Sequence, residues 1–101
     1  MRISIKEICG KNTVTRDDGK KINKLIREFW NKGDVIEIDF GNRVIASVSF
    51  MDEALGLLAL DYSKTELTNK LRLKNITTGD KNLLNNILIS KYKHAHLKKA
   101  L

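Results

Sequence analysis

The chain has 101 residues, no proline and a single cysteine, and its formal net charge is +7. A chain of this length supports one packed core, so residues 1–101 are expected to form a single domain with a basic tail at about 93–101 that frays. One cysteine cannot form an internal disulfide, the charged N-terminus is not a signal peptide, and the longest apolar run is too short for a bilayer. Together these features predict a cytoplasmic protein without a membrane contact.

The charge is distributed unevenly along the chain. Residues 1–32 hold 9 basic and 4 acidic side chains, residues 33–66 hold 2 and 7, and residues 67–101 hold 8 and 1. A strongly basic balance suits nucleic acid as a partner. Aromatic residues, on which bases stack, make up only 6% of the chain, which argues against a dedicated nucleic-acid binder.

The first half of the chain predicts a strand, a helix and a second strand. "RISI" at 2–5 alternates polar and apolar residues, as a short strand does. Thr15 and Asp18 have the spacing of a capping box, and Gly33 is a usual helix stop. Between them apolar residues recur at helical spacing: Ile22, Leu25, Ile26, Phe29 and Trp30. "VIEIDF" at 35–40 is β-branched and predicts the central strand.

The second half repeats this order. After a loop at 41–49, "FMDEALGLLALDY" at 50–62 is apolar on almost every face and predicts a buried helix, in which Gly56 indicates close packing. Residues 63–70 predict a further helical turn, and "LRLKNI" at 71–76 predicts the third strand. "TTGD" at 77–80 begins the last helix, with an apolar stripe to near its end: Leu83, Leu84, Ile87, Leu88 and Tyr92.

This alternation of strands and helices favours crossover connections, which make neighbouring strands parallel. We therefore predict an α/β fold with a small, mostly parallel or mixed sheet of about four strands, covered by three to four helices.

No set of residues has the spacing of a catalytic, metal or cofactor site. Asp52 and Glu53 are adjacent, so on a helix they point about a hundred degrees apart. His94 and His96 also diverge and are expected to be solvated. Cys9 follows an apolar residue and is expected to be a small buried thiol. These observations predict a protein that is not an enzyme and uses no cofactor.

The candidate site lies in the acidic middle of the chain. Asp39 and Asn42 follow the central strand, at the end where α/β sheets usually bind ligands and partners. The loop then leads to Ser49 and Asp52, which have capping-box spacing, and acidic side chains in a first turn complement the helix dipole. Taken alone, these acids are best explained as a helix cap; their position beside the loop adds a docking role.

The pattern "VIEIDF", a loop and "FMDEALGLL" resembles the STAS domain of anti-sigma factor antagonists. It is more similar to the STAS-like domains of unknown function from bacteria, archaea and phages. That family combines a "DF" strand end, a loop with serines before "F-x-D-E", and a later "L-x-N" strand end. The matching residues cover nearly the whole chain: Thr15–Gly19, Asp39–Phe40, Ser47, Ser49, Phe50–Glu53 and Leu73–Asn75.

The resemblance implies a non-catalytic, STAS-like regulatory module that binds a protein, plausibly a GHKL-type ATPase or kinase. In anti-sigma antagonists a serine at this helix start is phosphorylated. Here Asp52 matches the family's Asp, Glu53 its first serine and Ala54 the phosphorylated serine. The candidate acceptors are therefore Ser47 and Ser49. The predicted docking surface comprises Asp39, Asn42, Ser47, Ser49, Asp52 and Glu53.

The alternative function is that of a nucleic-acid-binding regulator that uses the basic flanks. Its candidate residues lie on the first long helix and near the C-terminus: Lys20, Lys21, Lys24, Arg27, Lys91 and Lys93. The competing explanation is an ordinary solvated basic face. An exposed edge on the first strand would also allow two copies to pair as a homodimer.

Overall fold

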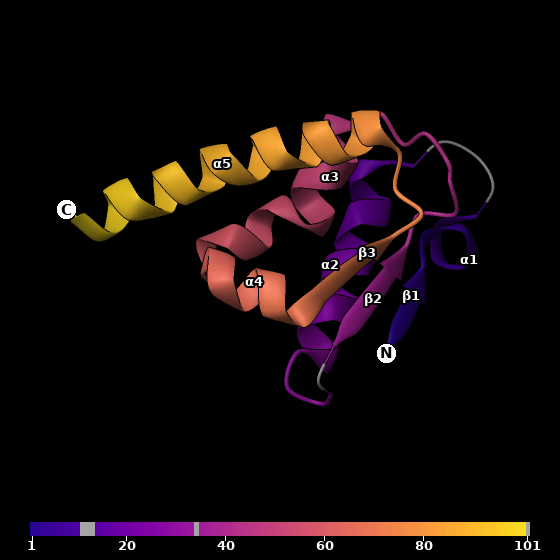
Figure 1. The fold of residues 1–101 in the computed structure, drawn as a ribbon, viewed down its shortest axis with the longest axis horizontal. Helices are drawn as coiled ribbons and strands as arrows, with labels where there is room; N and C mark the ends of the chain where they lie inside the picture. The colour runs from indigo at the N-terminus through magenta and orange to yellow at the C-terminus, as the bar shows by residue number, and fades with distance from the viewer. Residues whose placement is uncertain (11–13, 34, 101) are drawn as a thin grey trace.

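The computed structural model describes residues 1–10, 14–33 and 35–100, and the side chains of residues 96–100 lie outside this description. Its centre is a parallel sheet of three strands in the order β1-β2-β3 (Figure 1). The strands are short: β1 (Arg2–Ser4), β2 (Ile36–Asp39) and β3 (Leu71–Lys74). Because β2 lies in the middle, β1 and β3 are the edge strands of this sheet.

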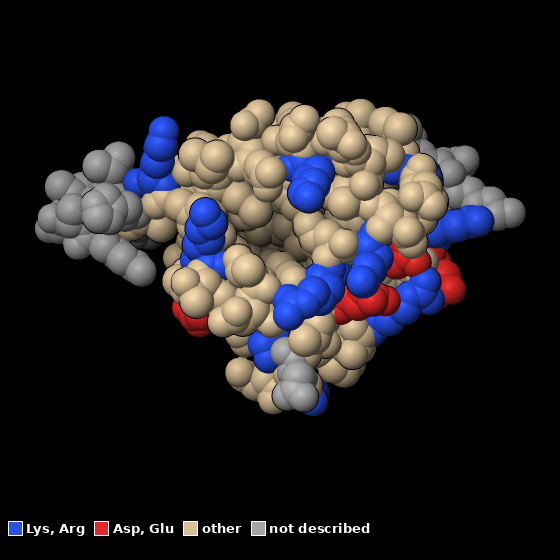
Figure 2. All heavy atoms as spheres, in the orientation of Figure 1, with Lys and Arg blue, Asp and Glu red and all other residues tan. Residues whose placement is uncertain are grey.

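Helical segments make both crossovers. The first contains α1 (Ile5–Cys9) and α2 (Arg16–Phe29), and the second contains α3 (Val48–Ala54), the 3-10 helix η1 (Gly56–Leu60) and α4 (Lys64–Lys70). The last helix, α5 (Thr78–Ala100), runs along the top of Figure 1, and its C-terminal end projects beyond the body of the molecule. The space-filling view shows a hollow on the front of the molecule, below α5 (Figure 2).

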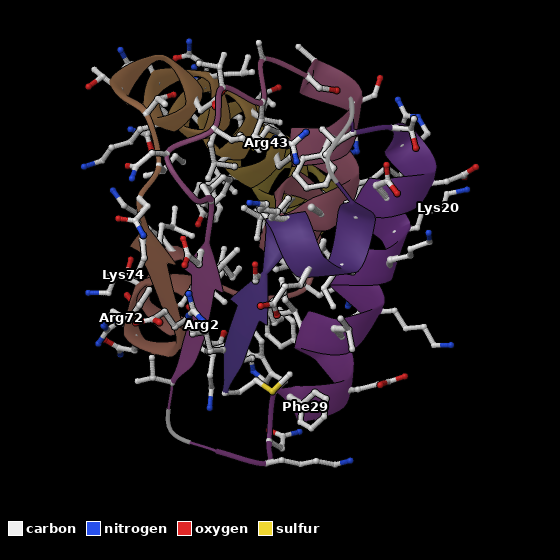
Figure 3. All side chains as sticks on the ribbon, turned by 90° about the vertical axis from the view of Figure 1, so that its right-hand side faces the viewer. Arg2, Lys20, Phe29, Arg43, Arg72 and Lys74 are labelled. Atoms are coloured by element: carbon white, nitrogen blue, oxygen red, sulfur yellow. The ribbon has the colours of Figure 1, made fainter. Side chains whose placement is uncertain are left out.

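The two faces of the sheet differ in polarity. One cross-strand row consists of Ile3, Ile38 and Leu73, and the isoleucines are almost completely buried under the helices. The neighbouring row consists of Arg2, Glu37 and Arg72, which lies on the opposite face because side chains alternate along a strand. Figure 3 shows Arg2, Arg72 and Lys74 on the side of the sheet away from α2. The helices therefore cover one face, and charged side chains cover the other.

The apolar face of the sheet and the helices share one core. Capping boxes begin α2 at Thr15 and α4 at Ser63, as the sequence predicts for α2. The largest fully buried side chains come from β1, β2 and the helices alike: Phe40, Phe50, Ile3, Ile5, Ile22, Ile26, Ile36, Ile38, Met51 and Leu58.

Two glycines allow helices to approach each other closely. A Cβ atom on Gly19 of α2 would lie 2.8 Å from the Phe50 carbonyl oxygen of α3. A Cβ atom on Gly56 would lie 2.8 Å from the Ile87 side chain of α5. The close packing predicted at Gly56 is thus confirmed, and Gly19 has the same role between α2 and α3.

The α/β class and the parallel pairing are confirmed, but the predicted counts are not. The described parts of the chain form three strands rather than about four, and five α-helices rather than three to four. The loop adds no strand, because Ala46 has a left-handed φ of 46° and the N–H groups of Ile45 and Ala46 donate to a side chain instead of to a neighbouring strand. The predicted helix at 50–62 is split: α3 ends at Ala54, and η1 follows.

Candidate functional site

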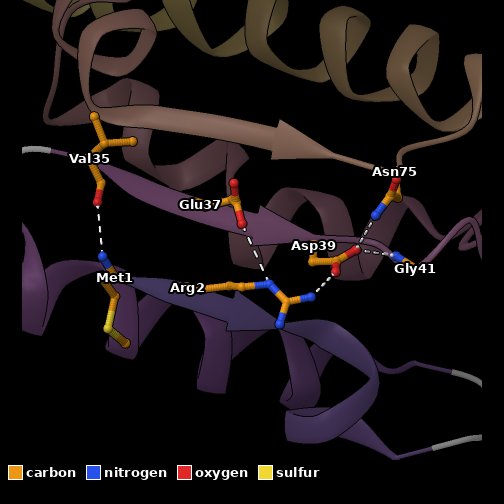
Figure 4. A network of polar contacts seen from close by, with 7 residues as sticks. All are labelled: Met1, Arg2, Val35, Glu37, Asp39, Gly41 and Asn75. Carbon is orange, nitrogen blue, oxygen red and sulfur yellow. Dashed lines mark hydrogen bonds and ion pairs between the residues drawn. The ribbon is translucent and has the colours of Figure 1, made fainter.

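The carboxylate of Asp39 is bound from both neighbouring strands at the C-terminal edge of the sheet. It accepts hydrogen bonds from the Arg2 guanidinium of β1, from the Gly41 N–H at 2.8 Å and from the Asn75 side-chain amide at 3.0 Å (Figure 4). Arg2 also reaches Glu37, with 3.5 Å between its Nε and a carboxylate oxygen. Asp39 shares the outer face of the sheet with Glu37, yet it is only 9% exposed because its hydrogen-bond partners cover it.

The bonds from Asn75, Gly41 and Arg2 lower the pKa of the Asp39 carboxyl below its ordinary value, because each of them favours the charged form. Asn75 holds its position through a left-handed backbone, with a φ of 55°, and its carbonyl accepts the Asn42 N–H at 2.8 Å. The "DF" and "L-x-N" strand ends of the sequence are therefore directly hydrogen-bonded to each other.

Asp80, which the sequence analysis treated only as part of a helix start, fixes the loop. Its side chain accepts the Ile45 N–H at 2.6 Å and the Ala46 N–H at 2.8 Å, and the residue is 2% exposed. It is the single acidic residue of the last third of the chain, and that isolation was the signal that could have identified it. Through these bonds the first turn of α5 holds the middle of the loop.

The loop held in this way presents apolar side chains to solvent. Val44 is 72% exposed and Val48, the first residue of α3, is 59% exposed, whereas Ile45 between them is buried. Asn42 is exposed with a left-handed φ of 59°. Ser47 is the N-cap of α3 and accepts the Phe50 N–H at 3.2 Å. Asn42, Val44 and Val48 are thus exposed residues of one ordered segment, and Ser47 caps the helix that follows the loop.

The two acids of α3 are paired with bases from two different helices. Glu53 lies 2.7 Å from an Arg16 nitrogen of α2, and the same guanidinium lies 3.5 Å from the Ser49 hydroxyl. Asp52 instead lies 3.1 Å from the Lys91 ammonium of α5. The divergence predicted for these neighbours is confirmed. Neither carboxylate caps α3: its N-cap is Ser47, and the predicted pairing of Ser49 with Asp52 was wrong because the helix begins two residues earlier.

Most residues of this site lie in the part of the chain that a protein-family model matches. The model described as a STAS-like domain of unknown function matches residues 18–81, which is well over half of the chain. The chain belongs to the STAS-like family. No curated protein and no solved structure matches it significantly.

The residue that the sequence resemblance matches to the phosphorylated serine of anti-sigma antagonists, Ala54, is buried. Ala54 has no measurable exposure, and its carbonyl oxygen accepts a hydrogen bond from Asn23 of α2 at 3.4 Å. The position thus lacks both a hydroxyl group and access to another protein. Ser47 and Ser49 are half-buried and lie nearer the surface.

Most of the bases predicted to contact nucleic acid are paired with acids of this STAS-like domain. Lys20 and Lys21 lie 3.9 and 3.7 Å from Asp17 and Asp18, and Arg27 lies 2.9 Å from Asp61. Lys91 is paired with Asp52, while Lys24 and Lys93 are exposed. These pairs reduce the charge available for phosphates, and nucleic-acid binding stays a prediction.

Metal binding and thiol chemistry have little support in the described part of the chain. It holds no cluster of three or more His, Cys, Asp or Glu side chains that could bind a metal ion. Cys9 is half-buried, and burial raises the pKa of its thiol, which disfavours the reactive thiolate. His94 is exposed, and the side chain of His96 lies outside the description. No helix among these residues is both long and apolar enough to cross a bilayer.

The hold of Asp80 on the loop can be tested by substitution. Asp80→Ala leaves the buried Ile45 N–H without an acceptor, so the free energy of unfolding should fall by about 1–3 kcal/mol. Asp80→Asn keeps one acceptor oxygen and should lose less. Urea unfolding measures the stability, and amide hydrogen exchange at Ile45 reports whether the loop is still held.

The control for the Asp80 variants is Asp61→Ala, which removes an exposed ion pair and should change stability by less than about 1 kcal/mol. Equal stability of the Asp80→Ala and Asp80→Asn variants would contradict this role.

The Asp39 network predicts a pH dependence of stability. Since the pKa of this carboxyl is lowered in the folded protein, its stabilising contribution is present above its ordinary value of 3.8 and is lost as the pH falls through the lower folded-state value. Asp39→Asn should therefore be less stable than the natural protein at pH 7, and the difference should shrink on acidification. Urea titrations at pH 7, 4 and 3 measure this difference. A difference that stays constant over that range would show that the charge of Asp39 is not responsible.

Proposed function

We propose that this STAS-like domain is a non-catalytic regulatory module that binds a protein partner through residues 41–49. The proposal is supported mainly by two exposed valines, Val44 and Val48, on a backbone that two buried carboxylates hold in place. Functional surfaces are commonly carried by loops on a rigid scaffold. A loop that is already ordered loses less conformational entropy on binding, so more of the contact energy contributes to affinity.

The polar surroundings of the valines supply specificity. Asn42 lies on the same loop, and Ser49, Arg16 and Glu53 form a connected polar group beside Val48. Charged groups at the edge of an apolar patch select among partners more than they add affinity. The resemblance to anti-sigma antagonists favours a GHKL-type ATPase or kinase as the partner.

Ser49 is the better candidate for phosphorylation under this proposal. The hydroxyl of Ser47 already caps α3, whereas the hydroxyl of Ser49 lies beside the Arg16 guanidinium at 3.5 Å. A phosphate on Ser49 would add about 1.5 to 2 negative charges and a strong partner for Arg16. Arg16 would then leave Glu53, whose charge would no longer be neutralised next to the binding surface.

The binding surface is tested with purified GHKL-type ATPases from the same genome and the full chain. Val44→Glu and Val48→Glu place charge on the apolar patch, so each should weaken binding about tenfold. The matched control is Leu60→Glu, an exposed apolar residue on η1 that lies outside the surface and should leave binding unchanged. Interferometry measures the dissociation constants. Absence of binding by the natural chain would exclude this partner class, and equal weakening by all three variants would exclude the surface.

The phosphorylation site is tested by incubating the chain with the same kinases and ATP. We expect a mobility shift on a phosphate-affinity gel that Ser49→Ala abolishes and Ser47→Ala preserves, because only Ser49 is free of the helix cap. Mass spectrometry of the product locates the phosphate. A shift that survives Ser49→Ala, or no shift with any kinase of this class, would contradict the switch.

A further inference from the structure

An apolar groove opens where β3, α4 and α5 meet. Its volume is about 420 Å³, within the range of sites that hold ligands. Figure 2 shows it as the hollow below α5. Aliphatic side chains from all three elements form most of its wall: Leu67, Leu71, Leu73, Leu84, Leu88 and Ile89. Ile89 is 52% exposed, so this apolar surface reaches solvent.

The groove lies along the outer edge of the sheet. Backbone polar groups point to alternate sides along a strand, and the Lys74 carbonyl accepts the Phe40 N–H that follows β2. The N–H and C=O of Leu73 must therefore point away from β2, toward the outer edge. On that edge the groups of Leu71 are already engaged, its N–H by the Leu67 carbonyl and its C=O by the Arg72 guanidinium. Leu73 thus presents a donor and an acceptor beside the groove.

The charge around the groove is positive. Lys64 of α4 lines it, and none of the described residues in its wall is acidic. Arg72 and Lys74 alternate with the two leucines of β3 and are exposed at the same edge. Figure 2 shows basic side chains around the hollow. An apolar groove with basic side chains at its edge is complementary to a peptide segment in which apolar side chains stand between carboxylates.

We propose that the groove binds an extended acidic segment of a partner protein, added alongside β3, with apolar side chains at alternate positions inserted between α4 and α5. The Leu73 N–H and C=O would pair with the backbone of the segment, as in other complexes where a peptide extends a sheet. Apolar residues two apart lie on one face of an extended chain, about 7 Å from each other, and the acids between and beside them face the basic edge. This surface is separate from residues 41–49.

The proposal is tested by selecting ligands from a random 12-residue peptide phage library on the full chain. Selected peptides should carry two apolar residues at alternate positions flanked by Asp or Glu. Synthetic copies should bind the natural chain and bind Ile89→Glu about tenfold more weakly, because the new carboxylate repels them at an apolar contact. Lys64→Glu should also weaken binding and reduce its salt dependence. Acid at this first position of α4 complements the helix dipole, so the fold is preserved.

Variants of the first surface provide the control. Val48→Glu should leave peptide binding unchanged, and Ile89→Glu should leave binding of the GHKL-type ATPase unchanged, so the two proposals fail independently. Peptides of basic or purely polar sequence, peptides that bind Ile89→Glu as well as the natural chain, or no enrichment at all would overturn the groove proposal. So would a dimer in light scattering that Ile89→Glu dissociates, because a second copy would then occupy the groove.

Discussion

The C-terminal edge of the sheet depends on one carboxylate. Asp39 receives hydrogen bonds from Arg2, at the start of one edge strand, and from Asn75, just after the other, so a single side chain at the end of β2 links all three strands. It also receives the Gly41 N–H, which sets the direction in which the chain leaves β2. The loop continues from that point to the carboxylate of Asp80, and from there to Val48 at the start of α3. Without the Asp39 carboxylate, the Gly41 N–H would lose its acceptor, and the start of the loop would no longer be held.

The same network lies on the face of the parallel sheet that none of the described helices covers. Parallel sheets are usually buried on both sides. Here the outer face carries a row of alternating charge, Arg2, Glu37 and Arg72, and a second row of Ser4, Asp39 and Lys74. Opposite charges on neighbouring strands attract, which suits a face in contact with water. The conformational entropy lost by the long basic side chains is partly offset, since Arg72 also bonds the Thr68 carbonyl at the end of α4.

Periodicity in the sequence was enough to predict the parallel α/β fold, because β2 and α2 follow their ideal patterns closely. It was not enough for residues 50–62, which are apolar in all directions and therefore do not indicate where a helix ends. The five residues of α1 were missed because little more than one helical turn is too short to show helical periodicity, and its first residue, Ile5, was assigned to the first strand. Asp39 and Asn42 were predicted at the correct edge, but the hydrogen bonds that bury the Asp39 carboxylate come from Arg2 and Asn75, which lie 37 and 36 residues away. Sequence spacing carries no information about such pairs.

The length of α5 has a mechanical consequence. One continuous helix holds the loop through Asp80 in its first turn and forms a wall of the groove through Ile89, and these residues lie about 13 Å apart along its axis. A helix is stiff over this distance, so a segment in the groove that displaced α5 would also move the Asp80 carboxylate and the amides of Ile45 and Ala46 that it holds. Under the two proposals, a groove ligand that changed the affinity of residues 41–49 for their partner would have its own affinity changed by the same factor when that partner binds.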